Sequence, residues 1–297
     1  MSCSHTVTGA TGNTGRVIAE SLLAQGHNVR VVGRSAERMQ PLVDKGAEAF
    51  VGSVEDAQFL ASAYQGVDAV YAMIPPNPQS DDYVAEAARV SKAHVDAIKK
   101  AGVKHVVALS SIGAHRPDGT GVVGVLYSFE QDLADLDGVN VLSLRPAYFM
   151  DNIYPQAQLI KAMGFVGTPV DGDVTMPVVH TRDVGEVAAA RMSDRGFSGH
   201  DVEYVLGPRD ISYNEITAAL GKAIGQDSLN YIKFPPDQAV VGFQQFGFSE
   251  NVARLIVDLS EGVNNGVVLE NYERTPENTT KTSLEEFAKE FGQLFNQ

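Results

Sequence analysis

The sequence predicts an α/β protein in which a doubly wound parallel sheet carries a smaller, mostly helical lobe. Two observations lead to this prediction. From residue 6 to about residue 146, short β-branched runs alternate with segments whose apolar residues recur at helical spacing. Four of these helical segments end at a glycine, the residue best suited to follow a helix. The alternation favours a parallel sheet with helices on both faces.

The expected strands define the sheet. They are "HTVTG" (5–9), "NVRVVGR" (28–34), "AEAFVGS" (47–53), "DAVYAMI" (68–74), "HVVALSS" (105–111) and "VNVLSLRP" (139–146). Continuous apolar stretches such as "VVAL" fit strands buried on both faces. The expected helices cover residues 16–26, 35–46, 54–66 and 80–102.

After residue 146 the regular alternation weakens. Residues 212–225 form an amphipathic helical pattern, and further helices are expected within 238–263 and 282–295. We therefore expect a first domain over residues 1–150 and a smaller lobe for a substrate or partner over residues 151–297. Strands within about 176–206 are expected to return to the main sheet.

Composition excludes several classes of protein. No apolar run approaches the ~18 residues of a membrane span, and a net charge of -14 disfavours direct binding to nucleic acid. Cys3 is the one cysteine of the 297 residues, and neither a signal peptide nor a set of residues at metal-ligand spacing is recognisable. The expectations are a cytoplasmic protein without metal or membrane association. The sequence does not indicate an oligomeric state.

The stretch "TVTGATGNTGR" (6–16) is the most informative motif. Gly9 permits a tight turn, Gly12 lets a pyrophosphate approach the main chain, and Gly15 lets the next helix pack closely on the sheet. Amide groups at the helix start then face the phosphates. The residues expected to contact the dinucleotide here are Gly9, Thr11, Gly12, Asn13, Thr14 and Gly15. Within a βαβ unit this pattern predicts a Rossmann-type dinucleotide site; the alternative is a purely structural turn.

The end of the second strand indicates which dinucleotide binds. An acidic residue there would suit NAD, whereas the sequence has Gly33 and Arg34, and an arginine suits the 2′-phosphate of NADP. NADP(H) is therefore favoured over NAD(H), although Arg34 could also be a solvated charge and Arg38 could serve instead.

Two further strand ends are expected beside the cofactor. Ser53 follows the third strand, where it could form a hydrogen bond near the adenine, and Ile74 and Pro75 follow the fourth. The proline-rich stretch after Ile74 would form a wall along the cofactor or, alternatively, only a rigid loop.

Ser110 and Tyr127 are the candidate catalytic residues. Ser110 ends the fifth strand, and Tyr127 follows in the next expected helix. Such a hydroxyl pair can hold a substrate carbonyl beside a nicotinamide while the tyrosine donates a proton. The alternative is that Tyr127 only lines the pocket.

These motifs, together with "VVGRS", "LSSIGA", "LSLRPAYFMDN", "VVHTRDVGEVAA" and "YVLGPRDISYNEI", resemble the NmrA-like group of atypical short-chain dehydrogenase/reductases over nearly the whole chain. The resemblance implies an NADP-binding Rossmann domain and a smaller C-terminal lobe. It also implies that Pro146, Ala147, Tyr148 and Phe149 line the nicotinamide end, that Asp183 caps a helix, and that His180 has a packing role. The group includes quinone oxidoreductases, triphenylmethane reductases and redox-sensing regulators.

One departure from that pattern bears on function. Ordinary short-chain dehydrogenases have a lysine four residues after the tyrosine, and this chain has Gln131 there. Without that charge a tyrosine, pKa ~10, is a poor base but still a proton donor, which favours reduction over oxidation and disfavours epimerase chemistry. The sequence thus predicts an NADPH-dependent reductase of a quinone-like or conjugated small molecule. The alternative is a cofactor-sensing regulator that acts through a protein partner.

The second lobe is expected to supply the substrate wall in the reductase interpretation. Its aromatic candidates are Tyr148, Phe149, Tyr154, Phe243 and Phe246, although such residues are more often part of a core.

Overall fold

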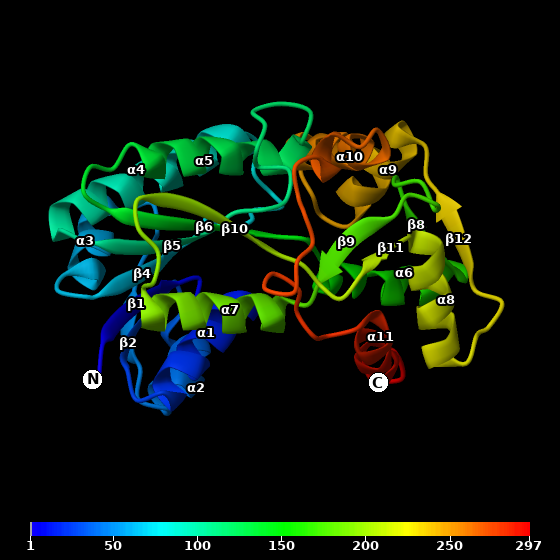
Figure 1. Cartoon of the computed structure of the whole chain (residues 1–297). Coiled ribbons are helices and arrows are strands. Elements are labelled where there is room, and N and C mark those ends of the chain that lie inside the picture. Colours follow the sequence, from blue (N-terminus) through cyan, green and yellow to red (C-terminus); the bar gives the residue numbers. More distant parts are fainter. Residues whose placement is uncertain (1) are drawn as a thin grey trace.

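Seven parallel strands form the centre of the molecule, and the computed structural model describes residues 2–297 (Figure 1). From edge to edge the strands are β10 (His200–Val205), β6 (Asn140–Pro146), β5 (His105–Leu109), β4 (Ala69–Ala72), β1 (Ser4–Thr8), β2 (Asn28–Gly33) and β3 (Glu48–Val51). Every neighbouring pair is parallel. The strand order reverses between β1 and β4, and ligands of such sheets bind at the carboxyl ends of the strands beside the reversal. The predicted fold class is confirmed.

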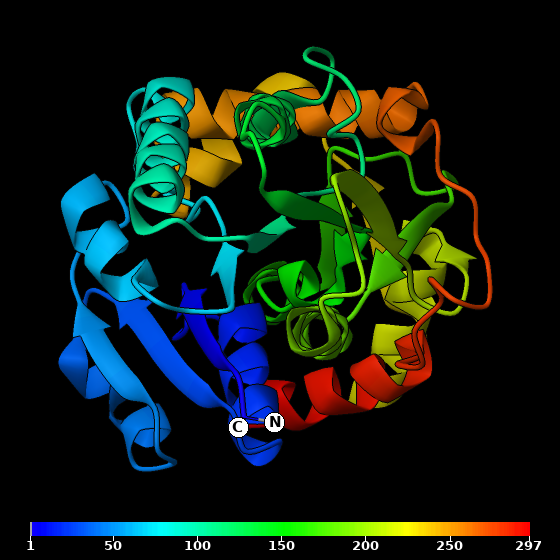
Figure 2. The same cartoon turned by 60° about the vertical axis from the view of Figure 1, so that its left-hand side comes forward.

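Helices cover both faces of this sheet (Figures 1 and 2). One face carries α1 (Asn13–Ala24), α2 (Ala36–Val43) and α7 (Thr181–Asp194), and the other carries α3 (Ala57–Tyr64), α4 (Tyr83–Ala101) and α5 (Gly124–Ala134). The glycines expected to follow α1, α2, α3 and α4 all have positive φ, with values of 79°, 103°, 71° and 68°. Their position in the sequence therefore located the helix ends correctly.

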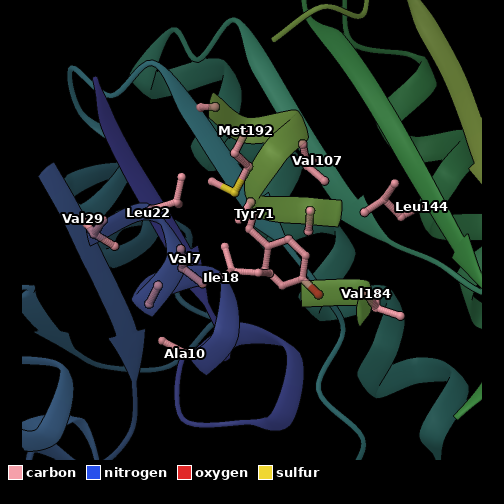
Figure 3. Close-up of a cluster of buried hydrophobic side chains, with 14 of the residues drawn as sticks. Val7, Ala10, Ile18, Leu22, Val29, Tyr71, Val107, Leu144, Val184 and Met192 are labelled. Carbon is pink, nitrogen blue, oxygen red and sulfur yellow. The ribbon is translucent and has the colours of Figure 1, made fainter. Parts of the chain in front are cut away.

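The core between the sheet and α1 and α7 is built around Tyr71 of β4 (Figure 3). The Tyr71 ring is fully buried, and its hydroxyl lies 3.2 Å from the Thr14 hydroxyl at the start of α1. α1 and α7 pack closely, because a Cβ on Gly185 would lie 2.6 Å from Cβ of Val17. This packing fixes the start of α1 against the sheet.

The smaller lobe contains most of the chain after residue 146 (Figure 1). Its helices are α6 (Gln156–Met163), α8 (Tyr213–Ile224), α9 (Pro236–Gln245), α10 (Glu250–Asn264) and α11 (Leu284–Phe295), and the short 3-10 helices of the chain are η1 (Gly121–Val123), η2 (Met150–Ile153) and η3 (Val267–Leu269). β7 (Tyr148–Phe149), β9 (Met176–Val179) and β11 (Asp210–Ile211) form a three-stranded sheet, and β8 (Phe165–Thr168) pairs with β12 (Asn230–Lys233). Within the described residues, no helix is long and apolar enough to cross a membrane.

The two strands that the sequence placed within residues 176–206 behave differently. β10 pairs with β6 and extends the main sheet, whereas β9 pairs with β7 and β11 outside it. β9 has only four residues, and all of them are buried. A fully apolar strand of this length would fit the main sheet as well as the three-stranded sheet, so its sequence does not indicate which strand it pairs with.

Direct hydrogen bonds fasten the smaller lobe to the main sheet at the loop after β4. The Ser249 amide donates to the Pro78 carbonyl at 2.8 Å, and the Ser249 hydroxyl donates to the Ser80 carbonyl at 2.5 Å. Asn251 accepts from the Tyr83 amide at 3.0 Å. The start of α10 is therefore held beside the loop that leaves β4, at the carboxyl end of the strands.

Candidate functional site

The turn between β1 and α1 is too tight to accommodate side chains at Gly9, Gly12 and Gly15. Gly9 has a φ of 63°, in the left-handed region that favours glycine. A Cβ on Gly15 would lie 2.3 Å from the Gly9 carbonyl oxygen, and a Cβ on Gly12 would lie 3.2 Å from the same atom. The loop thus folds back onto its own main chain, which leaves backbone rather than side chain at its surface.

The first turn of α1 presents unused amide groups. Gly12 is the N-cap residue and offers no side chain to the helix. Within the described residues, the amides of Asn13, Thr14 and Gly15 donate to no protein group. Amides of this kind, at the positive end of a helix dipole, form an anion-binding site. We call these three amides the cradle. A dinucleotide pyrophosphate fits the cradle, because its oxygen atoms can accept the hydrogen bonds for which the protein provides no acceptor.

Three strand ends meet around this loop. A Cβ on Gly33, at the end of β2, would lie 3.8 Å from the Thr11 methyl group. A Cβ on Gly9 would lie 2.9 Å from Sδ of Met73, directly after β4. The Asn13 side chain donates to Asp151 at 3.1 Å, just beyond β7. The fold thus brings together several of the stretches that the sequence singled out for the cofactor.

Arg34 directly follows β2, and its side chain contacts no hydrogen-bonding or charged group among the described residues. It is exposed, and within residues 2–297 it makes no hydrogen bond or ion pair. Ser35 begins α2 by accepting from the Arg38 amide at 3.3 Å, which places Arg38 one turn further along. Ser53 lies after β3, where its hydroxyl accepts from the Glu55 amide at 3.2 Å. Arg34 is therefore available for a ligand, whereas Ser53 has a local role in its own turn.

Ile74 and Pro75 lie in a loop that a buried histidine anchors. Ile74 is buried and Pro75 is half-buried. His94 of α4 contacts the Met73 carbonyl through Nε2 at 3.2 Å and the Tyr64 hydroxyl through Nδ1 at 2.8 Å. Burial lowers the pKa of His94 from 6.5 to about 4, so this histidine is neutral in the folded protein near neutral pH.

This burial predicts acid sensitivity. Above pH 6.5 His94 is neutral in the folded and in the unfolded protein. Between about pH 6.5 and about pH 4 it is protonated in the unfolded chain but stays neutral in the folded protein. We expect His94 to lower the free energy of unfolding by about 3 kcal/mol as pH falls from about 6.5 to about 4. Denaturant unfolding of the wild type and of His94→Gln at several pH values measures this difference. Equal pH dependence of the two proteins would show that His94 is not responsible.

Ser110 belongs to a buried charged cluster that sequence reasoning missed. Its hydroxyl donates to Glu130 of α5, and Glu130 forms an ion pair with Arg145 of β6 at 2.5 Å. Arg145 also contacts the Tyr204 hydroxyl at 3.2 Å and the Ala114 carbonyl at 3.4 Å. Burial opposes the charge of Arg145, but its bonds to Glu130 outweigh that effect and raise its pKa. The Ser110 proton is therefore directed to Glu130.

Tyr127 lies one turn before Glu130 on α5, so both residues share a side of the helix. It is half-buried, and among the described residues its hydroxyl has no hydrogen-bond partner. It also belongs to none of the hydrophobic clusters. Gln131 is exposed one turn later. This geometry leaves the Tyr127 hydroxyl available to a ligand.

The segment 146–149 passes from the main sheet into the smaller lobe. The Pro146 carbonyl accepts from the Ile112 amide at 2.9 Å, and the Ala147 amide donates to Val205 at 3.0 Å. Tyr148 accepts from the Tyr213 hydroxyl at 3.0 Å. Its neighbour, the half-buried Phe149, packs against the core around Tyr71. This segment is thus held on both sides, next to the loop that follows β5.

The other predicted aromatic residues are dispersed. Tyr154 packs on Phe287 with ring centroids 5.0 Å apart, and Phe243 packs on Phe248 at 5.5 Å. Phe246 is exposed. Tyr154 and Phe243 therefore contribute to packing within the smaller lobe. This agrees with the alternative that these aromatic residues belong to a core and do not line a substrate site.

His180 has the packing role that the resemblance implied, because its buried ring lies edge to face on Phe287 at 6.2 Å, but it also takes the capping role expected of Asp183. His180 caps α7, because its Nδ1 accepts from the Arg182 amide at 3.0 Å. Asp183 instead accepts from the amide and hydroxyl of Thr282, at 3.0 and 2.7 Å. Asp183 thus fastens the segment before α11 to α7.

The fold and the loop geometry define a Rossmann-type α/β protein. The model of the NmrA-like family matches residues 4–287, so this chain belongs to the NmrA-like family. The predicted resemblance is confirmed.

Known proteins of similar sequence or structure extend this comparison. The chain is 27% identical over 253 residues to NAD(P)H azoreductase of Xenophilus azovorans, with 85% of each chain covered. It superposes on triphenylmethane reductase of Citrobacter sp. with a TM-score of 0.81 at 18% identity, over 98% of this chain and 99% of the other. It also superposes on an NADPH-dependent quinone oxidoreductase of Escherichia coli, solved with NADPH, with a TM-score of 0.80 at 23% identity, over 98% and 100%. The two structural likenesses support the fold.

Proposed function

We propose that this protein is an NADPH-dependent reductase that transfers hydride to a quinone-like or other conjugated small molecule. The observation that carries the proposal is the set of unused amides at Asn13, Thr14 and Gly15, which fits a dinucleotide pyrophosphate. The named functions of the relatives support the reaction class, because azo compounds, triphenylmethane dyes and quinones are all conjugated acceptors. A cytoplasmic location is part of the same proposal.

The chain's own residues would hold the cofactor along the carboxyl edge of the sheet. The loop residues Gly9 to Gly15 would bind the pyrophosphate, and Arg34 would bind the 2′-phosphate. Ser53 would lie near the adenine. Ile74 and Pro75 would form one wall, and Pro146 to Phe149 would line the nicotinamide end. When bound, NADPH supplies a hydride ion, and the acceptor then needs one proton.

Tyr127 is the proposed proton donor. Its hydroxyl has no protein partner within the described residues, so it can donate to an oxygen or nitrogen of the acceptor. Ser110 cannot donate to the acceptor while its proton goes to Glu130. We therefore assign Ser110 a positioning role, in which it fixes the turn of α5 that follows Tyr127.

Replacing Tyr127 with phenylalanine tests the donor role. We expect kcat to fall at least tenfold for acceptors that must take a proton from the protein, because general acid catalysis contributes about 10²–10⁴-fold. KM for NADPH should change little. Ser128→Ala, at an exposed position of α5, is the matched control. Unchanged turnover of every accepted substrate by Tyr127→Phe would remove Tyr127 from the mechanism.

Arg34→Ala tests the cofactor preference. A charge-assisted hydrogen bond contributes about 1.5–3 kcal/mol, so its loss should reduce the preference for NADPH over NADH at least tenfold. NADH lacks the 2′-phosphate and serves as the internal control when KM is measured for both cofactors. If Arg38→Ala changes this preference and Arg34→Ala does not, the phosphate contact belongs to Arg38 instead.

The reductase proposal is tested by following NADPH oxidation with a panel of quinones, azo dyes and triphenylmethane dyes. Saturable turnover with at least one acceptor is the expected result. Absence of turnover across the panel, by folded protein that binds NADPH, would contradict it.

A second candidate is a regulator that binds the cofactor without turning it over. The exposed Gln131 favours this candidate, because it stands where a catalytic lysine would activate Tyr127. One relative at 25% identity over 265 residues, covering 85% of this chain and 80% of its own length, is the Prestalk A differentiation protein A of Dictyostelium discoideum. Capture of a protein partner that depends on whether NADP or NADPH is present would favour the regulator over the reductase.

A further inference from the structure

Three side chains with metal-ligating atoms meet at the amino end of β1, the end opposite to the glycine loop. They are Cys3, His5 and His27, and one ligand atom from each lies within 4.8 Å of the others. Parallel pairing of Ser4 with Asn28 brings them together, because the residues around the starts of β1 and β2 become neighbours. This cluster contains none of the residues proposed to bind NADPH.

His5 lies in the cluster without a hydrogen bond. Its side chain is fully buried, and neither Nδ1 nor Nε2 has a partner within the described residues. The His5 and His27 rings meet edge to face, with centroids 5.0 Å apart. Buried polar groups are normally hydrogen-bonded, and an unpartnered one calls for a specific cause such as a bound ion. His5 therefore offers a nitrogen ligand that nothing else in the fold uses.

We propose that Cys3, His5 and His27 bind a Zn²⁺ ion, which joins the start of β1 to the loop between α1 and β2. One thiolate and two imidazoles are ligands that Zn²⁺ prefers, and the fourth position would take water. With metal bonds of about 2.0–2.3 Å, tetrahedral ligands lie ~3.5 Å apart, so side-chain shifts of about 1 Å close the site. Coordination releases the Cys3 thiol proton to solvent.

The surroundings of the cluster suit this coordination. His27 accepts from the Cys3 amide through Nδ1 at 3.1 Å, and its Nε2 pairs with the Ser193 hydroxyl at 2.9 Å. When one nitrogen of His27 binds the metal, it loses its hydrogen bond to Cys3 or to Ser193. Both of these partners are partly exposed, so water can take the place of His27 there. The guanidinium of Arg195 lies beside Cys3, and the negative charge of Asp68 near His5 offsets its positive charge.

The position of the cluster predicts a structural rather than a catalytic metal. Three residues of β1, Thr6 to Thr8, separate His5 from Gly9 of the glycine loop, and the two Cα atoms are therefore about 13 Å apart along the strand. A metal there would join the start of β1 to the loop that precedes β2. Its binding should therefore raise the melting temperature by a few degrees and leave NADPH binding unchanged.

The test is titration of the metal-free, full-length protein with Zn²⁺ under a phosphine reductant, together with Co²⁺ as a spectroscopic probe. We expect one Zn²⁺ per chain, a higher melting temperature, and a thiolate-to-cobalt charge-transfer band. Cys3→Ser should abolish the band and weaken Zn²⁺ binding at least tenfold, as should His27→Asn. His200→Asn, at an exposed histidine at the start of β10, is the matched control and should change neither.

Cys3 lies at the start of the chain and is only partly buried, so Cys3→Ser is expected to fold even if a change at His5 does not. Two results would overturn the proposal. One is equal Zn²⁺ affinity in the wild type and in Cys3→Ser. The other is the absence of a charge-transfer band in the wild type at saturating Co²⁺.

Discussion

Glu130→Ala is expected to lower the free energy of unfolding by about 3–5 kcal/mol, because it breaks a buried ion pair and leaves one partner uncompensated. The exposed fractions of the Arg145 and Glu130 side chains are only 12% and 7%. Glu130 also accepts the Ser110 proton, so the substitution removes two kinds of contact at once. Denaturant unfolding, followed by circular dichroism, measures the loss.

An exposed ion pair provides the control for this prediction. Arg254 and Glu250 of α10 lie 2.6 Å apart with 60% of each side chain exposed. Glu250→Ala should cost less than about 1 kcal/mol, because solvent screens such pairs. A similar small cost for Glu130→Ala would mean that the buried cluster does not hold β5, α5 and β6 together as described.

Gly15→Ala is the second substitution with a large expected effect. The added Cβ would lie 2.3 Å from the Gly9 carbonyl oxygen, so the loop or α1 must move. We expect a loss of about 1–3 kcal/mol of stability, as for other overpacked positions. We also expect NADPH binding to weaken at least tenfold, because the amides that form the cradle move with the loop. Calorimetric titration with NADPH measures the second effect.

Gly242→Ala is the matched control for Gly15→Ala. Gly242 lies within α9, and a Cβ there would meet nothing within 4 Å. Alanine should be neutral or stabilise the helix by up to about 1 kcal/mol, with NADPH binding unchanged. Wild-type binding by Gly15→Ala would contradict the assignment of the cradle.

The fold class and the glycine turn between β1 and α1 could be predicted from the sequence because their signals are local. A β-branched run, a glycine turn and a helical pattern follow one another within the first 26 residues, and each has a direct structural cause. The position of Arg34 directly after β2 could be predicted in the same way, whereas its contact with the cofactor stays a prediction.

Contacts between distant segments could not be predicted in the same way. Glu130 and Arg145 look like ordinary surface charges in "SFEQDL" and "LSLRP", and only the packing of α5 on β6 buries them. His27 is 24 residues from Cys3, beyond the spacing of a local metal motif, and strand pairing brings the two together. The position of Ser110 at a strand end does not reveal Glu130, the carboxylate that accepts its proton, because Glu130 lies 20 residues further along the chain.

The most direct test of the central claim is the stoichiometry of NADPH consumption by the purified protein with one saturating acceptor in the absence of oxygen. The account predicts that one NADPH disappears for each two-electron reduction of the acceptor, at a rate that saturates with acceptor concentration. NADPH that binds tightly but stays unconsumed with quinones, azo dyes and triphenylmethane dyes alike would contradict the reductase function.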